Sequence, residues 1–147
     1  MKILGIGVDL IENKRIKELI KNHKFRKRIY SNKELKQSSL YKNKIGYFSK
    51  RFAAKEAFAK AIGTGFRNNL NFKDIEVIND KMGKPYYVKT KKITKIIKKN
   101  FNIKKFNCFL SISDEKEYST AFTIIQSIWN LIKTLFQKML KLYFMLL

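Results

Sequence analysis

Residue types that crosslink or sharply bend a chain are scarce in these 147 residues, which contain one cysteine, one proline and six glycines. A single cysteine cannot form an intrachain disulfide. Cys108 lies in the apolar run from Phe106 to Ile112, which predicts a buried, unreactive thiol and fits a reducing, cytoplasmic location. The only histidine, His23, lies in a basic stretch without an acid beside it, and we assign it no catalytic role.

Acidic residues are also scarce, because 11 Asp and Glu stand against 33 Lys and Arg, which gives a net charge of +22. Such a charge favours an acidic partner, whether a nucleic acid, an anionic lipid, an acidic protein or a phosphorylated small molecule. Since a lysine-rich composition supplies part of the charge, it does not choose among these partners. The length and the hydrophobic fraction of 45% predict one folded domain, and the glycines and the acid within Met1–Asp9 argue against a signal peptide.

The central stretch Phe48–Lys60 has helical spacing and is followed by Gly63-Thr-Gly65, where glycines allow the backbone to turn away. Glu56 and Lys60 are four residues apart, so they share one helix face, with alanines on either side. A carboxylate and an ammonium among methyl groups leave room for a bulky ligand to come close. The alternative interpretation is a weak, solvated ion pair on a helix surface.

Residues 3–10 form a short, mostly apolar run that predicts a strand. Side chains alternate along a strand, so Gly5, Gly7 and Asp9 point to the same side. Asp9 would then stand at the end of a face without other side chains, where it is suited to hold a cation against a ligand. The alternative is that Asp9 caps the helix that the pattern predicts from Ile11 to about Asn22.

The remaining pattern predicts an α+β domain with antiparallel strands packed on helices. A capping box over Ser31–Glu34 begins a further helix. A strand over 72–78 and one starting at Pro85 would form a hairpin around Asn79–Gly83. A basic helix would follow over 91–100, and residues 106–113 would pair with 117–127.

Residues 127–147 differ in composition from the rest of the chain. Apolar residues recur there at helical spacing, and the only charges are Lys133, Lys138 and Lys141. Three lysines within a run of this length argue against a membrane span. We therefore expect a domain over 1–126 and an amphipathic helical extension over 127–147. This extension would touch the domain, another subunit or a lipid surface.

Four motifs together carry a family resemblance. They are Gly5-Ile-Gly-Val-Asp9, Arg51-Phe-Ala-Ala-Lys-Glu-Ala-Phe-Ala-Lys60, Gly63-Thr-Gly65 and Gly83-Lys-Pro85. Over residues 1 to about 126 the chain closely resembles the holo-[acyl-carrier-protein] synthase family of small bacterial 4′-phosphopantetheinyl transferases. The resemblance implies that the phosphopantetheine arm of coenzyme A passes to a serine of apo-acyl carrier protein, with release of adenosine 3′,5′-bisphosphate.

The resemblance also implies roles for matching residues. Asp9 and Glu56 would hold Mg²⁺, a hard cation that prefers carboxylate and phosphate oxygens, and the glycine face of the strand would let the ligand approach. Glu56, or a water on the metal, would take the proton of the attacking serine, and Lys60 would stabilise or protonate the departing phosphate. The expected coenzyme A contacts are Arg51, Lys55, Lys60, Gly83, Lys84 and Pro85, and the expected carrier-protein contacts are Arg15, Leu19 and Lys24.

Two features depart from the family pattern. Asp114 stands where many relatives have histidine, which would remove or reverse a contact with a nucleotide phosphate, although aspartate is also familiar at this position in the family and does not exclude activity. The segment from Ser127 continues beyond the usual end. The family further implies a homotrimer with its active site between adjacent subunits. The alternatives to an enzyme are a basic nucleic-acid-binding protein and a protein held at a membrane surface by its C-terminal segment. Against the first, the aromatic residues fall in strand and helix interiors rather than beside arginines on one surface.

Overall fold

The structure is a computed structural model that describes residues 2–67, 69–128, 139–140 and 145. Its elements are β1 (Lys2–Glu12), α1 (Asn13–Leu19), α2 (His23–Ile29), α3 (Asn32–Gln37), η1 (Ser38–Leu40), α4 (Lys44–Ile62), η2 (Phe72–Asp74), β2 (Val77–Asn79), β3 (Pro85–Tyr87), α5 (Lys91–Phe101), β4 (Phe106–Asp114) and β5 (Tyr118–Ser127). The predicted α+β class is confirmed. The helix predicted over 127–147 lies almost entirely outside the described residues, and no described helix is long and apolar enough to cross a membrane.

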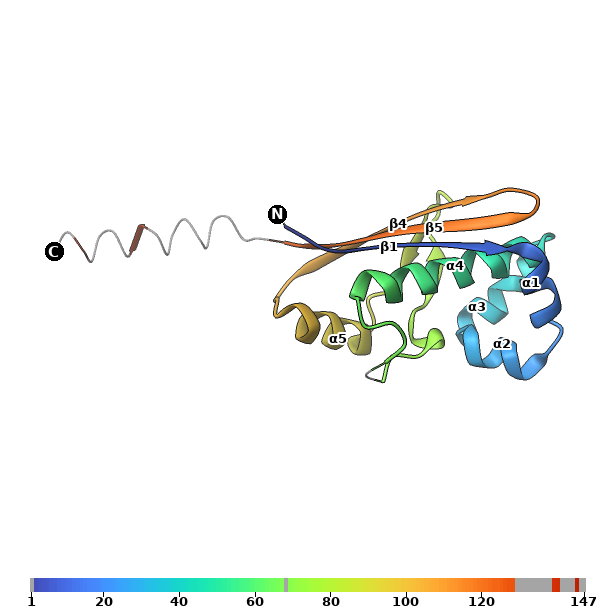
Figure 1. Ribbon diagram of the computed structural model, residues 1–147, viewed down its shortest axis with the longest axis horizontal. Helices are drawn as coiled ribbons and strands as arrows, with labels where there is room; N and C mark the ends of the chain where they lie inside the picture. Colours follow the sequence, from blue (N-terminus) through green and yellow to red (C-terminus); the bar gives the residue numbers. More distant parts are fainter. Residues whose placement is uncertain (1, 68, 129–138, 141–144, 146–147) are drawn as a thin grey trace.

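Three long strands form an antiparallel sheet in the order β1–β5–β4. The first strand of the chain therefore pairs with the last, from Lys2 opposite Ser127 to Glu12 opposite Tyr118. The predicted pairing of the last two strands is also confirmed, with Phe106 opposite Ser127 and Asp114 opposite Ser119. Figure 1 shows α4 lying lengthwise under this sheet, with α1, α2 and α3 at one end of the domain and α5 at the other.

The central helix is α4, which begins one turn earlier than the sequence pattern predicts. The Asn43 side chain caps it by accepting a hydrogen bond of 2.9 Å from the amide of Gly46. The helix ends as predicted at Gly63, whose φ of +83° is a left-handed conformation that glycine adopts without steric cost. Most of its side chains are buried, because the sheet covers one side and the smaller elements cover the others.

Two predicted element boundaries are wrong. The first strand runs through Ile11 and Glu12, because both residues pair with β5, and α1 therefore begins only at Asn13. The segment 72–78 is not one strand. Its first part is the 3₁₀ turn η2, which Asn71 and Asp74 close with a reciprocal capping box, so that only Val77–Asn79 remains to pair with β3.

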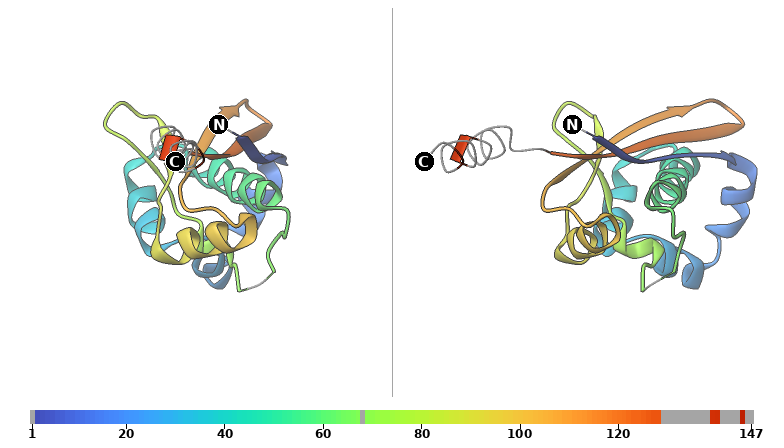
Figure 2. Two further views of the ribbon diagram at one scale, coloured as in Figure 1. Left: turned by 90° about the vertical axis from the view of Figure 1, so that its left-hand side faces the viewer. Right: turned by 60° about the vertical axis from the view of Figure 1, so that its left-hand side comes forward.

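The two faces of the sheet have different surroundings. On the inner face, side chains such as Thr123 and Ile125 are fully buried against the helices. On the outer face, Ile6, Val8 and Leu10 of β1 are each more than half exposed, with relative exposures of 54%, 56% and 64%. Phe122 and Phe109 continue this apolar surface onto β5 and β4. Figure 2 shows in two further views that the helices lie on one side of the three-stranded sheet, so the apolar side chains of the other face are left open to solvent.

Candidate active site

Strand β1 and helix α4 approach each other closely through two glycines. A methyl group on Gly5 would overlap the carbonyl oxygen of Ala61, and one on Gly7 would overlap the carbonyl oxygen of Ala57. The expectation that the glycine face admits a ligand is therefore wrong, because the helix backbone occupies that face. What the glycines provide is a short distance between the two elements that carry the candidate catalytic residues.

Asp9 lies on the same side of β1, two residues beyond Gly7, and faces α4. Its Oδ1 accepts a hydrogen bond of 2.8 Å from the ammonium of Lys60, which also donates to the carbonyl oxygen of Val8 at 3.0 Å. Lys60 therefore pairs with Asp9 rather than with Glu56, its neighbour on the helix. The alternative in which Asp9 caps a helix is excluded, because Glu12 is the N-cap residue of α1 and that cap has no side-chain hydrogen bond.

Glu56 lies one turn before Lys60 on α4 and is half-buried. Burial raises the pKa of its carboxyl group, the charge of Asp9 raises it further, and the charge of Lys60 opposes both effects. Two carboxylates that repel each other across a strand–helix contact form a site that favours a cation. Within the part of the chain that the structure describes, no cluster of three or more Asp, Glu, His or Cys residues occurs, so such a cation would take further ligands from substrate or water.

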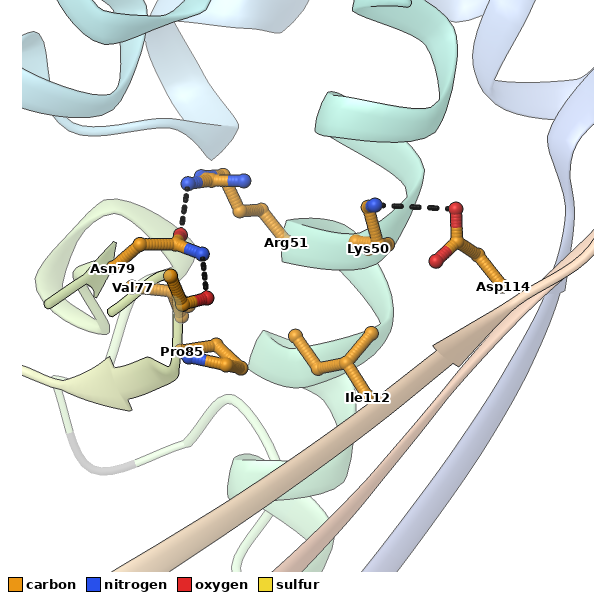
Figure 3. Close-up of a pocket in the computed structure, with 8 residues that line it drawn as sticks. Lys50, Arg51, Val77, Asn79, Pro85, Ile112 and Asp114 are labelled. Atoms are coloured by element: carbon orange, nitrogen blue, oxygen red, sulfur yellow. Dashed lines mark hydrogen bonds and ion pairs between the residues drawn. The ribbon is translucent and has the colours of Figure 1, made fainter. Parts of the chain in front are cut away.

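A cavity of about 170 Å³ opens beside the N-terminal half of α4 (Figure 3). It is built by residues from four regions of the chain that are far apart in sequence. They are Lys50 and Arg51 of α4, Val77 and Asn79 of β2, Gly83 and Pro85 of the hairpin, and Ile112 and Asp114 of β4. Three of the predicted coenzyme A contacts, Arg51, Gly83 and Pro85, thus line one cavity. Lys84 is exposed and is not among the lining residues.

Arg51 is fixed in the wall of this cavity. Its Nη2 donates to Asn79 Oδ1 at 3.0 Å, its Nη1 donates to the carbonyl oxygen of Tyr47 at 3.3 Å, and its guanidinium lies 3.4 Å from the centroid of the Tyr47 ring. Its Nε is buried without a hydrogen-bond partner in the described structure. The side chain is therefore a rigid positive group that uses two of its five N–H donors in these hydrogen bonds.

Lys55 lies in the core of the domain and not at the predicted coenzyme A site. Its side chain is fully buried, and its ammonium donates to Glu34 Oε2 at 2.8 Å and to the carbonyl oxygens of Phe72 and Ile75 at 3.0 and 2.6 Å. All three hydrogens of the ammonium are used, so none remains for a phosphate. The expectation that Lys55 contacts coenzyme A is contradicted, because this side chain joins α4 to α3 and to the segment before β2.

The sequence pattern missed Lys50, which precedes Arg51 and faces the same cavity. Its Nζ lies 3.1 Å from Oδ2 of Asp114, and the dashed line in Figure 3 marks this pair. Asp114 was singled out only as a departure from the family pattern. An acid at residue 114 calls for a basic partner, and Lys50 is that partner. A single sequence does not show that residues 50 and 114 lie side by side, so the pair could not be predicted.

The cavity and the Asp9–Lys60 pair lie near each other in the fold. Asp9 pairs with Ala121, which pairs with Ile112 in the cavity wall, so Asp9 and Ile112 are two strands apart, or roughly 10 Å. Along α4, Glu56 lies five residues after Arg51, or roughly 7.5 Å. Ala121, which lies between Asp9 and Ile112 on the sheet, is buried under α4, and five residues turn a helix by about 140°, so the cavity and Glu56 lie on different sides of α4.

The residues expected to contact a carrier protein are all accessible. Arg15 and Leu19 lie four residues apart on α1, and both are exposed. Lys24 is exposed in the first turn of α2, whose N-cap Asn22 accepts hydrogen bonds from the amides of Lys24 and Phe25. An apolar side chain between two cations is thus presented at the end of the domain where β1 leads into α1.

Comparisons with known proteins identify the family of the domain. Residues 5–124 match the family model of the 4′-phosphopantetheinyl transferase superfamily. The chain is 64% identical over 126 residues to a holo-[acyl-carrier-protein] synthase of Pelagibacter ubique, an alignment that covers 86% of this chain and 98% of the relative. It is similar in structure to a holo-(acyl-carrier-protein) synthase from Bacillus anthracis in complex with CoA (3′,5′-ADP), with a TM-score of 0.71 and 35% identity over 86% of this chain and 98% of the other. The corresponding enzyme from Neisseria meningitidis gives a TM-score of 0.77 and 37% identity, covering 86% of this chain and all of the other (100%).

Proposed function

The chain belongs to the 4′-phosphopantetheinyl transferase superfamily, and from this premise we propose how its residues carry out the reaction. As a holo-[acyl-carrier-protein] synthase, it transfers the 4′-phosphopantetheine group of coenzyme A to a serine of apo-acyl carrier protein and releases adenosine 3′,5′-bisphosphate. The serine oxygen forms a bond to the phosphorus that carries the pantetheine arm. The bond from that phosphorus to the bridging oxygen breaks, and the nucleotide departs.

We propose that Asp9 and Glu56 hold Mg²⁺. The observation that carries this proposal is the ammonium of Lys60, which already lies 2.8 Å from Asp9 Oδ1 as a cation beside the two carboxylates. Two carboxylates suit Mg²⁺, which commonly takes one or two protein ligands and completes its shell with substrate phosphates and water. When bound, the metal ion would neutralise charge on the pyrophosphate of coenzyme A.

Glu56 is the proposed base for the serine hydroxyl. Burial and the charge of Asp9 raise its pKa in the metal-free protein, and a water held by the metal ion would be the alternative acceptor. Lys60 is the proposed partner of the departing phosphate, because its side chain is 53% exposed and can leave Asp9 for a nearby anion. The chain thus offers an acceptor for the serine proton and a donor for the leaving group within one helical turn.

The cavity beside α4 is the proposed site for the nucleotide end of coenzyme A. Arg51 and Lys50 supply positive charge there, and Gly83 and Pro85 supply an apolar edge. Asp114 holds Lys50 at the rim, so the cation at this position comes from α4 rather than from a histidine on β4. This arrangement supports a phosphate contact through Lys50 despite the acid at residue 114.

We further propose a homotrimer in the cytoplasm that docks apo-acyl carrier protein on Arg15, Leu19 and Lys24. The open apolar strip on the outer face of the sheet supports self-association, because a second copy would remove it from water. The exposed basic helix supports an acidic carrier as partner. The single cysteine, which cannot form an intrachain disulfide, fits a reducing compartment.

Intact-mass spectrometry of apo-acyl carrier protein tests both the reaction and the site. We expect the carrier to gain the mass of a phosphopantetheine group when incubated with the protein, coenzyme A and Mg²⁺. We expect the gain to disappear with EDTA, and Glu56→Ala to lower the rate by about a hundredfold or more, since a base and a metal ligand are lost together.

Glu115→Ala is the matched control, because Glu115 is an exposed carboxylate whose side chain makes no hydrogen bond in the described structure. This variant should keep the parental rate. A folded Glu56→Ala protein that modifies the carrier at the parental rate would rule out the proposed role of Glu56. No mass gain with the parental protein and several acidic carriers would contradict the reaction itself.

A further inference from the structure

Helix α5 presents a basic surface that the transfer reaction does not use. The side chain of Thr90 caps the helix by accepting a hydrogen bond from the amide of Ile93, and Ile93 and Ile97 are buried in the core. The opposite side of the helix therefore faces solvent. A hollow of about 440 Å³ there is lined by Lys89, Lys91, Thr94, Lys95 and Lys98, which we call the α5 lysine surface.

This surface has no acidic residues to balance it. The segment from Lys81 to Ser113, both included, contains ten lysines and no aspartate or glutamate. Within the described part of the chain, only one lysine of α5 forms an ion pair, Lys92 with Asp74, and Lys92 is not part of the α5 lysine surface. Lys89 is held at the edge of the hollow by the carbonyl oxygen of Phe106 at 3.0 Å. Neighbouring cations that repel one another favour an external ligand with several negative charges.

The α5 lysine surface lies away from the site of the reaction. Figure 1 places α5 at the opposite end of the domain from α1, α2 and α3, where the proposed carrier contacts are. No residue of the α5 lysine surface lines the nucleotide cavity. An acidic carrier protein bound at α1 would therefore leave α5 free for a different anionic partner.

The chain leaves the domain at the same end. The amide of Ile128 donates to the carbonyl oxygen of Lys105 at 3.0 Å, so the backbone after β5 starts beside the lysines that follow α5. Residues 129–147 contain no acid, three lysines and a series of apolar residues that includes Trp129 and Phe136. A partner that accepts this end of the protein must offer negative charge and an apolar environment side by side.

We propose that the α5 lysine surface binds an anionic phospholipid membrane. Lipid phosphates match the unbalanced lysines, and the boundary between headgroups and acyl chains matches the apolar residues that follow Ile128. A nucleic acid matches the lysines but offers no apolar environment for the residues that follow Ile128. The inference concerns where the enzyme resides and does not depend on the proposed catalytic roles.

Vesicle co-sedimentation of the full-length protein tests the proposal. We compare neutral phosphatidylcholine vesicles with vesicles that contain about 30% phosphatidylserine or phosphatidylglycerol, at about 0.1 M salt. The parental protein should bind the anionic vesicles at least tenfold more tightly than the neutral ones. The variant K91Q/K95Q/K98Q should lose at least tenfold in affinity, since each lysine near such a surface contributes roughly fivefold.

The matched control is K33Q/K36Q/K42Q, which removes the same charge from exposed lysines at the α3 end of the domain. Its affinity for the anionic vesicles should stay within about twofold of the parental affinity, a range that includes the small effect of the lower net charge. Circular dichroism and the carrier-modification rate in solution establish that both variants are folded and active.

Three outcomes overturn the proposal. They are equal losses in the two variants, equal binding to neutral and anionic vesicles, and binding to a short DNA duplex that depends on the α5 lysines when vesicles do not bind.

Discussion

At the scale of single residues, the site is defined by which partner each charged side chain has. Lys60 lies against Asp9 and remains half exposed, whereas Lys55 is enclosed with Glu34 and has no free hydrogen. Lys55 and Lys60 lie five residues apart on one helix, and only the Lys60 side chain is exposed enough to change its partner. Exposure and pairing therefore separate a residue suited to catalysis from one that supports the fold.

Replacing Lys60 should separate catalysis from metal binding. In Lys60→Met the carboxylates of Asp9 and Glu56 lose their nearby cation, so Mn²⁺ should bind the free protein more tightly, by about tenfold. The transfer rate should fall by about a hundredfold, since a donor to the departing phosphate is lost.

Titration of Mn²⁺ followed by electron paramagnetic resonance measures the metal affinity of this variant without any turnover. Lys36→Met, an exposed lysine on α3, serves as the control and should change neither quantity. Weaker Mn²⁺ binding in Lys60→Met would show that Lys60 supports the metal site rather than competing for it.

At the scale of elements, the contact between β1 and α4 brings the site together. Sequence periodicity predicted both elements and the side on which Asp9 lies, because alternation and helical spacing are local properties of the chain. It could not show that the face with Gly5 and Gly7 is covered by α4. A glycine in a strand is compatible with a ligand, a bulge or a second backbone, and the choice depends on contacts distant in sequence.

Adding one methyl group should disrupt this contact. Gly7→Ala should lower the free energy of unfolding by about 3 kcal/mol or more, because its Cβ would overlap the carbonyl oxygen of Ala57 and the helix must shift. Gly63→Ala should cost only about 1–2 kcal/mol, since its Cβ meets no atom and only the positive φ is unfavourable. Urea denaturation followed by circular dichroism measures both, and the reverse order of the two losses would contradict the packing described.

The Glu34–Lys55 pair gives a second prediction about elements. Glu34 Oε2 also accepts from the amide of Ser31 and Oε1 from that of Val77, so the pair joins α3, α4 and β2. Lys55→Met leaves a buried carboxylate without its counter-ion and should cost about 3–5 kcal/mol of stability in urea denaturation. The KM for coenzyme A of the folded variant should stay within about twofold of the parental value, because the Lys55 side chain has no hydrogen left to bind the substrate. A large increase in KM with unchanged stability would restore the phosphate contact predicted from the motif.

The same pair marks a limit of motif-based assignment. Arg51, Lys55, Glu56 and Lys60 all lie in one distinctive block, and the block correctly identified the family. It did not separate Arg51, Glu56 and Lys60, which belong to the candidate site, from Lys55, which faces the core. Lys50, just before the block, lines the cavity and was overlooked.

At the scale of the whole molecule, the outer face of the sheet is an apolar surface that no other part of the described chain covers. Ile6, Val8 and Leu10 lie in a row on β1, and Phe122 and Phe109 continue the row across β5 and β4. Strand alternation predicts that one side of β1 is apolar, but not that this side stays open while the other is covered. The proposed trimer gives this surface a partner.

A charge on this face should dissociate the oligomer. Phe122→Lys places an unpaired ammonium on the central strand of the outer face, and its burial in an interface should weaken association by at least about a hundredfold. Sedimentation velocity should show trimers for the parental protein and smaller species for the variant. Leu40→Lys, at an apolar residue that is 80% exposed outside this face, should leave the trimer intact. A parental protein that sediments as a monomer would contradict the proposed assembly.

The pairing of β1 with β5 also has a consequence for how the protein is made. Lys2 leaves the ribosome first among the sheet residues, yet its partner Ser127 is added only after every helix of the domain has been synthesised. Because β5 is the central strand of the sheet, neither β1 nor β4 has a partner until then, and the contacts that close the sheet are among the longest in the chain. The apolar face of β1 therefore stays exposed throughout translation. We expect the high positive charge of the nascent chain to help keep it dispersed until its last strand emerges.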